Sequence, residues 1–225
     1  MTDLYLAAET VETERSDPCL YEGQYITRFK RFFDVTLVLL TLPVIVPVVF
    51  VLWTVVRLDG GPGFFLHQRI GLKGRPFQCL KIRSMNPGAA EQLGAILSND
   101  PALQSQWRTK RKLENDPRIT RIGRFLRQTS LDELPQLWNV VRGEMSLVGP
   151  RPVPLDELAN YASSRQIYEA MRPGITGLWQ ISGRNSVSYQ ERIQLDARYL
   201  EIRSLKVDVM ILWRTLRLVV QPNGI

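Results

Sequence analysis

The chain has 225 residues, of which 44% are hydrophobic, enough for one domain with a buried core. Its formal net charge of +7, from 29 basic and 22 acidic residues, predicts a polyanionic partner: nucleic acid, an anionic membrane surface or a phosphorylated substrate. The single histidine, His67, and two widely separated cysteines argue against a Ser-His-Asp triad and against a cysteine-histidine metal site.

The first 22 residues contain six acidic residues and one basic residue. This composition predicts a flexible acidic tail over residues 1–27. The positive charge is therefore concentrated in the rest of the chain, which is the part expected to meet the anionic partner.

Residues 35–56 contain no charged side chain and are long enough to cross a bilayer as a helix. Pro43 and Pro47 lie in the middle of this segment, and basic residues flank both of its ends. Basic flanks prefer the cytoplasmic side, so a helix that enters and returns on one face satisfies both ends. We therefore predict a proline-broken, re-entrant anchoring helix over 28–58, although the pattern leaves a single span open.

Residues 59–225 are predicted to form one catalytic domain associated with the membrane from the cytosolic side. FFLHQRIG (64–71) and RPFQCLKIRSM (75–85) are typical of a β-hairpin, and residues 86–117 of a loop with short helices. Alternation in the second strand places Phe77, Cys79, Lys81 and Arg83 on one face. The two cations could reach a common anion or face solvent.

Two later segments, 118–128 and 206–220, have the pattern of basic amphipathic helices. Apolar residues fall on one helical face in each, with arginines between them, and Trp213 suits a membrane interface. Packing against a core with the arginines in water is the alternative. The fold class predicted from these elements is α+β and mainly helical, with a small hairpin and interfacial helices around one catalytic domain.

TSLDELPQLWNV (129–140) places Asp132 and Glu133 side by side before an apolar run. Ser130 followed by Glu133 matches a capping box, which predicts the start of a helix. The alternative is that one carboxylate is a chemical reagent, kept ionised by the N-terminal end of the helix dipole.

Two loop motifs present arginines on a restricted backbone. GEMSLVGPRPVP (143–154) begins as a short apolar strand and then holds Arg151 between prolines, and RPGITGLWQISGRNS (172–186) contains three glycines with Arg172 and Arg184. Guanidinium groups held in this way suit phosphate, which arginine can bind through two hydrogen bonds. The segment after them, 188–203, is expected to form a helix that carries Asp196.

Taken together, KRFFDVTLVLL, FLHQRIGLKGRPFQCLKIRSM, TSLDELPQLWNV, GEMSLVGPRP, RPGITGLWQISGRN and LDARYLE resemble the bacterial sugar transferases. These are monotopic polyprenyl-phosphate phosphoglycosyl transferases, and the resemblance covers residues 28–222 in the same order. The chain looks like the minimal, single-domain form of the family. It departs from the family at the membrane break, where Val46-Pro47 stands in place of Ser-Pro.

The resemblance implies transfer of a sugar-1-phosphate from a UDP-sugar to polyprenyl (undecaprenyl) phosphate. This is the first membrane step of surface-polysaccharide synthesis, on the cytosolic face of the bacterial inner membrane. GLWQISGRN is similar to members that handle a simple hexose such as galactose or glucose. The partners would be the UDP-sugar, the polyprenyl phosphate and membrane lipids, and a homo-oligomer is left open.

The resemblance also implies roles for individual residues. Asp132 would be the nucleophile that forms a phosphoryl-aspartate, and Glu133 would be the main ligand of a Mg²⁺ ion, with Asp132 close to it. Substrate and phosphate contacts would come from Lys81, Arg83, Arg127, Arg151, Arg172, Arg184 and Asp196.

Two other classes of function compete with this one. A catalytically inactive membrane-surface binding or scaffold protein would explain the charge and the anchor, but not the TSLDELPQ, GPRP and RPGITGLWQISGRN motifs. Nucleic-acid binding is suggested only by the net charge, and no recognition element supports it. We therefore expect no nucleic-acid partner.

Overall fold

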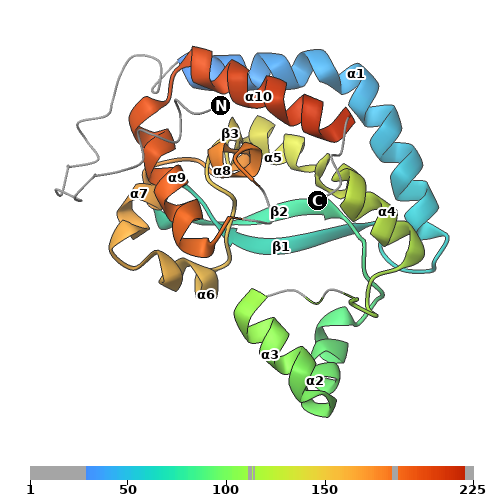
Figure 1. The fold of residues 1–225 in the computed structure, drawn as a ribbon. Coiled ribbons are helices and arrows are strands. Elements are labelled where there is room, and N and C mark those ends of the chain that lie inside the picture. The colour runs from blue at the N-terminus through green and yellow to red at the C-terminus, as the bar shows by residue number, and fades with distance from the viewer. Residues whose placement is uncertain (1–28, 111–112, 114, 184–186, 221–225) are drawn as a thin grey trace.

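The computed structural model describes residues 29–110, 113, 115–183 and 187–220 (Figure 1). The predicted tail, 1–27, and Arg184 lie outside these residues. The helices are α1 (Lys30–Arg57), α2 (Ala89–Asn99), α3 (Pro101–Lys110), α4 (Arg121–Thr129), α5 (Gln136–Arg142), α6 (Leu155–Leu158), α7 (Arg165–Glu169), α8 (Leu178–Ile181), α9 (Tyr189–Ile202) and α10 (Leu205–Val220). The strands are β1 (Phe64–Ile70), β2 (Pro76–Ile82), β3 (Ser146–Val148) and β4 (Gly174–Thr176). The mainly helical α+β class is confirmed.

Helix α1 is unbroken from Lys30 to Arg57, with both prolines inside it. Proline removes a hydrogen bond within a helix and favours a kink, and α1 changes direction between its first and second halves (Figure 1). The predicted break is therefore a bend in a continuous helix. Among the described helices, α1 is the one whose length and composition suffice to cross a membrane. Leu40, Val44 and Phe50 on it are 64–72% exposed.

The first turns of α1 are fixed to the body by buried polar contacts. Lys30 Nζ donates to Asp208 Oδ2 over 2.5 Å, and the hydroxyl of Ser146 donates to Asp34 Oδ2 over 2.7 Å. The hydroxyl of Tyr199 donates to the other oxygen of Asp208 over 2.6 Å. Asp208 belongs to α10 and Ser146 to β3, so one end of α1 is tied directly to two elements of the body, and Tyr199 of α9 holds Asp208 in place. Much of the rest of α1 is exposed.

The predicted hairpin is confirmed: β1 and β2 pair antiparallel, with His67 opposite Cys79 and Arg69 opposite Phe77. A single 3-10 turn, Leu72–Gly74, joins the strands. Since facing residues in an antiparallel pair share a side of the sheet, His67, Arg69, Phe77 and Cys79 all project to the same side.

Arg83, just after β2, holds the far end of α1. The side chain is buried, and its guanidinium group donates to the carbonyl oxygens of Val56 (2.9 Å), Pro62 (2.7 Å) and Met85 (3.0 Å). It is directed at these carbonyls and does not line the pocket described below. Lys81 and Arg83 therefore do not converge on one anion, and the predicted phosphate contact of Arg83 finds no support in its position.

A second pair of strands, which is parallel, packs against α1 and α10. Ser146 of β3 pairs with Gly174 of β4, and both α1 and α10 contact β3. The strand predicted in GEMSLV is confirmed, but reading RPGITGLWQI purely as a loop was wrong, because it contains β4 and α8. The chain following β3 meets β4 closely: a Cβ added to Gly174 would lie 2.2 Å from the backbone nitrogen of Gly149.

The main core gathers residues from the hairpin, α1, α5, β3 and α10, including Val38, Cys79, Val140, Met145, Val148 and Ile211. A second cluster beneath α9 contains Tyr161 and Tyr168. Asp196 is buried beside it and accepts a 3.0 Å hydrogen bond from the hydroxyl of Tyr161, and burial raises its pKa to about 7. Asp196 thus projects from α9 toward Tyr161 and does not line the pocket where substrate contacts were expected.

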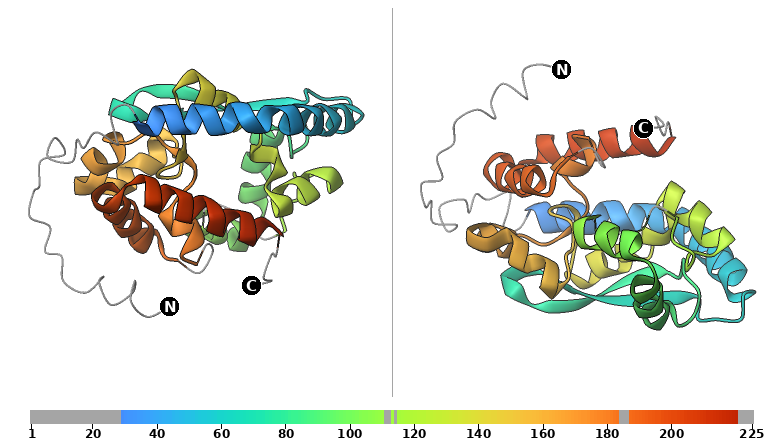
Figure 2. Two further views of the ribbon diagram at one scale, coloured as in Figure 1. Left: turned by 90° about the horizontal axis from the view of Figure 1, so that it is seen from above. Right: turned by 60° about the horizontal axis from the view of Figure 1, so that its bottom comes forward.

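The two predicted amphipathic helices are confirmed as helices with exposed apolar residues. Helix α4 begins at Arg121, three residues later than predicted, because the Thr120 hydroxyl caps it and the Arg118 guanidinium is bound to buried Asp116. Phe125 on α4 and Trp213 on α10 are exposed. Their contact with a membrane stays a prediction. The segment predicted as a loop with short helices forms the α2–α3 pair, which lies below the body in Figure 1 and comes to the front when the bottom is turned forward (Figure 2, right).

Replacement of Arg83 by methionine should destabilise the fold rather than alter substrate binding, because it leaves three buried carbonyl groups without a donor. We expect the free energy of unfolding to fall by about 2–4 kcal/mol. Thermal unfolding in detergent measures this, with Arg124→Met on the exposed side of α4 as the control. Equal stability of the two variants would contradict the structural role of Arg83.

The stability contributed by Asp196 should fall with rising pH. Its pKa in the folded protein, about 7, lies above the ordinary value near 3.9, so the unfolded chain loses this proton first as pH rises. The melting temperature of wild type should therefore fall relative to that of Asp196→Asn as the pH rises from 5 to 8. A difference that is constant across this range would refute the burial of an uncharged Asp196.

Candidate active site

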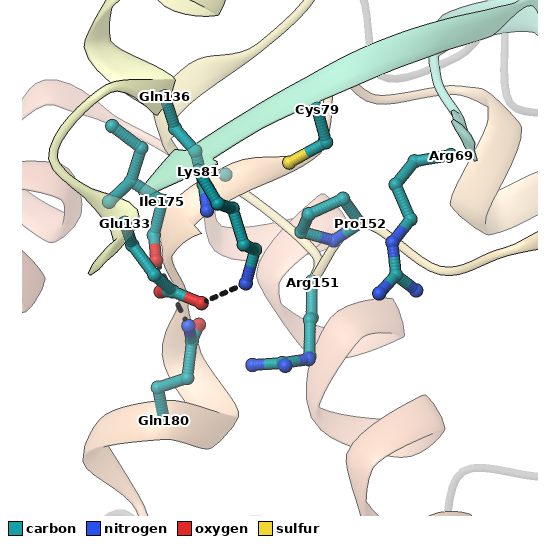
Figure 3. A pocket seen from close by; sticks show the side chains of 10 residues that line it. Arg69, Cys79, Lys81, Glu133, Gln136, Arg151, Pro152, Ile175 and Gln180 are labelled. Atoms are coloured by element: carbon teal, nitrogen blue, oxygen red, sulfur yellow. Dashed lines mark hydrogen bonds and ion pairs between the residues drawn. The ribbon is translucent and has the colours of Figure 1, made fainter. Parts of the chain in front are cut away.

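One pocket contains three of the residues that the sequence predicts for the site, Lys81, Glu133 and Arg151 (Figure 3). It lies where the hairpin, the turn before α5, the start of the GPRP loop and β4–α8 meet. Its lining consists of Arg69, Cys79, Lys81, Glu133, Gln136, Arg151, Pro152, Gly174, Ile175 and Gln180.

Asp132 and Glu133 lie on a single 3-10 turn, Leu131–Glu133, between α4 and α5. Ser130 precedes this turn in the left-handed conformation, with φ of 58°, and closes the end of α4. Its hydroxyl makes no capping bond, so the capping box predicted at Ser130 and Glu133 was wrong. The reciprocal box is instead found at Ser188 and Glu191, where α9 starts.

Asp132 is 7% exposed and lies beside the pocket rather than in its lining. Burial raises the pKa of this carboxyl above its ordinary value, and the neighbouring charge of Glu133 adds to the rise, while Lys81 and Arg127 act against it. The pKa of Asp132 is thus shifted upward, opposite to the direction expected at a helix N-terminus, and the contributions that act against the rise come from Lys81, Arg127 and a backbone hydrogen bond. Arg127 is fixed near this turn by a 3.0 Å hydrogen bond from its Nε to the hydroxyl of Ser84.

Glu133 accepts a 2.6 Å hydrogen bond from Lys81 Nζ, drawn as a dashed line in Figure 3. Burial alone would raise the pKa of Glu133, but Lys81 and Arg151 outweigh it and bring the pKa below its usual range. The two adjacent carboxyl groups are thus pushed in opposite directions. Pairs separated in this way are typical of sites in which the two acids have different tasks.

The remaining predicted arginine does not reach the pocket lining. Arg172 Nε donates to the carbonyl oxygen of Gly143 over 2.9 Å, at the C-terminal end of α5. Arg31 donates to the carbonyl oxygens of Val140 and Val141 at the same end. A cation at a helix C-terminus complements the dipole, so the position of Arg172 supports a structural contact rather than the predicted phosphate contact.

Among the lining residues that sequence reasoning missed, three have a guanidinium or amide side chain: Arg69, Gln136 and Gln180. Arg69 was accessible from the sequence, because strand alternation in the predicted hairpin puts it on the side of Cys79. Gln136 and Gln180 stand in the motifs TSLDELPQ and GLWQISGRN that were singled out, but no local pattern distinguishes them there.

The carboxyl pair suits a divalent cation only in combination with a substrate. Among the described residues, no group of three or more His, Cys, Asp or Glu side chains could hold a metal ion. Mg²⁺ commonly takes one or two carboxylates and completes its coordination with phosphate and water oxygens. Two adjacent acids, one of them buried with a raised pKa, fit this requirement, since a cation would relieve the cost of ionising both.

Comparison with known proteins gives the family. A family model described as bacterial sugar transferase matches residues 25–222. A UDP-galactose-lipid carrier transferase of Erwinia amylovora is 49% identical over 203 residues, covering 90% of this chain and 43% of that protein. An undecaprenyl-phosphate galactose phosphotransferase of Salmonella typhimurium is 47% identical over 195 residues, covering 87% of this chain and 41% of that protein.

The chain therefore spans less than half the length of these two curated relatives. A third relative has nearly the same extent: the exopolysaccharide production protein ExoY of Sinorhizobium fredii is 47% identical over 196 residues, which is 87% of each chain. Since the family model also covers most of the sequence, the chain belongs to the bacterial sugar transferase family.

Proposed function

We propose that this chain transfers a hexose-1-phosphate, such as galactose- or glucose-1-phosphate, from a UDP-hexose to undecaprenyl phosphate and releases UMP. The observation that carries this proposal is the placing of the Asp132–Glu133 pair at the edge of a pocket lined by Lys81 and Arg151. Two relatives whose names specify galactose support the choice of a hexose.

The first step is attack by the Asp132 carboxylate on the phosphorus that carries the sugar. A bond forms between Asp132 Oδ and this phosphorus, the bridging P–O bond of the diphosphate breaks, and UMP leaves with the electron pair. The ionised carboxylate is the reactive form and needs no proton transfer. Lys81 and Arg127 favour that form, because their charges oppose the effect of burial on the pKa of Asp132.

In the second step an oxygen of undecaprenyl phosphate attacks the same phosphorus. The Asp132–phosphorus bond breaks, so the carboxylate is regenerated, and undecaprenyl-diphosphate-hexose is the product. Arg151 faces the pocket where negative charge accumulates, and positioned cations of this kind stabilise phosphoryl transfer. Lys81 is already bound to Glu133 and so fixes that acid at the same place. Mg²⁺ held by Glu133 and Asp132 would supply charge neutralisation on the diphosphate.

We also propose that α1 enters the cytoplasmic membrane from the cytosol and returns to the same face. The site then lies at the membrane surface, where it can meet both a soluble donor and a lipid acceptor. The bend at the prolines, the exposed apolar surface of α1 and the basic residues at both of its ends support this arrangement.

Replacement of Asp132 by asparagine should abolish transfer, because an amide cannot form the acyl phosphate. UMP release by the purified protein with undecaprenyl phosphate, Mg²⁺ and a panel of UDP-sugars should fall by about 10³-fold or more. Asp59→Asn makes the same chemical change on an exposed residue outside the pocket and should retain full activity.

A donor labelled in its β-phosphate should also leave an acid-stable, hydroxylamine-sensitive label on the wild-type protein without lipid acceptor, and none on Asp132→Asn. Undiminished release by Asp132→Asn would rule out the covalent route. No release by wild type with any UDP-sugar would instead favour the binding or scaffold protein as the function.

The re-entrant arrangement predicts that both ends of α1 are on one side of the membrane. Single cysteines at Phe29 and Leu58, in a background without Cys19 and Cys79, should both react with an impermeant maleimide only from the cytosolic side of oriented vesicles. Pro43→Ala with Pro47→Ala should straighten the helix and move part of the Phe29 labelling to the opposite side. Labelling of the two ends from opposite sides in the unaltered helix would establish a single span.

A further inference from the structure

Arg69 is the charged residue of the pocket lining to which the proposed mechanism gives no role. It lies on β1 and projects to the same side of the hairpin as Cys79, which also lines the pocket. In Figure 3 its guanidinium group points into the open space, on the side away from Glu133, with the guanidinium group of Arg151 between them. Two guanidinium groups therefore face one cavity from different elements of the fold.

The neighbouring histidine contacts only one of the three nitrogen atoms of the Arg69 guanidinium group. Arg69 Nη2 lies 3.1 Å from Nδ1 of His67. Burial, together with the charges of Arg69 and Lys81, lowers the pKa of His67 to about 4, so the ring is neutral and Nδ1 can accept the hydrogen bond. The Nε atom of Arg69 is buried and has no hydrogen-bond partner in the part of the chain that the structure describes.

Unpartnered polar atoms are concentrated around this same cavity. Gln136 Nε2 and Gln180 Oε1 are also buried without a partner among the described residues, so three of the six such side-chain atoms belong to residues that line the pocket. Gln136 is only 2% exposed. Buried polar groups are nearly always hydrogen-bonded in folded proteins, and a cluster of exceptions around one cavity indicates a polar ligand there.

The charges in the lining specify an anion. Arg69, Lys81 and Arg151 carry three positive charges against the single negative charge of Glu133, a difference of +2. Glu133 is already bound by Lys81 over 2.6 Å. Arg69 and Arg151 therefore remain without an ion-pair partner in the lining, and a planar guanidinium group matches two oxygens of a phosphoryl group.

We propose that Arg69 binds a phosphoryl group of the anionic substrate directly, and that His67 positions its guanidinium group by accepting the hydrogen bond from Nη2. This inference rests on the function proposed above and adds a substrate-binding residue to it. Nε, Nη1 and the second N–H of Nη2 are the donors left, and Nη2 together with one of its two neighbours forms an edge that can meet two phosphoryl oxygens, while the neutral ring of His67 fixes the plane in which they lie. Arg69 binds and orients, and no bond to it forms or breaks.

The phosphoryl group can come from the diphosphate of the donor or from the phosphate of the lipid acceptor. Equilibrium binding of UDP and of farnesyl phosphate, each measured calorimetrically at constant Mg²⁺, separates these sources. Arg69→Gln should weaken one of the two by about 10- to 100-fold, as expected for the loss of charge-assisted hydrogen bonds, and Arg69→Lys should weaken the same ligand less. Arg75→Gln removes the same charge from an exposed position of the same hairpin and should leave both affinities unchanged.

Two variants of His67 test its positioning role separately. His67→Ala should weaken the same ligand by about 3- to 10-fold, and His67→Gln, whose side-chain carbonyl can also accept from Arg69, should restore most of the affinity. In turnover, Arg69→Gln should raise the KM of that substrate more than it lowers kcat, because the contact is made on binding. Melting temperatures of all variants within a few degrees of wild type exclude general unfolding.

The outcomes separate this inference from the proposed reaction. Unchanged UDP and farnesyl phosphate affinities in Arg69→Gln, with normal turnover by wild type, would overturn the role of Arg69 and leave the reaction standing. Weakened phosphoryl binding in Arg69→Gln, with no UMP release by wild type under any condition, would support the site while removing the reaction. Equal affinities in His67→Ala and wild type would remove the positioning role of His67.

Discussion

The contact on which the rest of the structure depends is the buried ion pair between Lys30 and Asp208, with Asp34 and Ser146 beside it. It joins the start of the apolar helix to α10 and β3 in an almost dry environment, where Asp208 is fully buried. Removing one partner of such a pair leaves the other as a buried charge without a counter-ion, which destabilises the folded state far more than losing a surface pair does. The helix is therefore fixed in position at one end, however exposed its apolar remainder is.

From that fixed end the architecture leads to the pocket in two short steps. Helix α1 contacts β2 and β3, and the guanidinium group of Arg83 binds the carbonyl oxygen of Val56 near the far end of α1. Strand β2 delivers Lys81, and the chain leaving β3 delivers Arg151. The carboxyl pair is added by a turn that packs against β2. Elements in contact with α1 thus carry the cations, so the position of the site follows from that of α1.

The parts of this structure that the sequence predicts are those set by short-range patterns. Alternation identifies the hairpin, and the 3.6-residue period identifies α4 and α10. The expected site residues Asp132, Glu133, Lys81 and Arg151 came instead from the resemblance to the sugar transferases, because the local pattern at Asp132-Glu133 fits a helix start equally well. Reading the hairpin alternation through to β1 would also have identified Arg69. The same pattern failed at Arg83, because the strand ends at Ile82 and the chain turns toward α1.

Other errors arise where one local sequence pattern is compatible with two different structures, and only tertiary contacts decide which of them forms. Ser-x-x-Glu occurs at both Ser130 and Ser188, but α4 runs directly into Ser130, which must end that helix in a left-handed conformation. Strand β4 is three residues long and pairs with a strand nearly thirty residues earlier, so no window of sequence contains its partner. The contacts of Arg172 and Asp196 are likewise made with distant segments: Arg172 binds the C-terminal end of α5, and Asp196 accepts a hydrogen bond from buried Tyr161.

The close approach of Gly149 and Gly174 constrains how this region can change over time. A methyl group on either one would enter the backbone of the opposing segment, at 2.2 to 2.4 Å. Neither segment can acquire a side chain at these points unless both backbones move apart, and the Arg151 and Gln180 positions would move with them. The two segments therefore act as one backbone unit, and a side chain added at either glycine would displace the residues that both segments carry to the pocket.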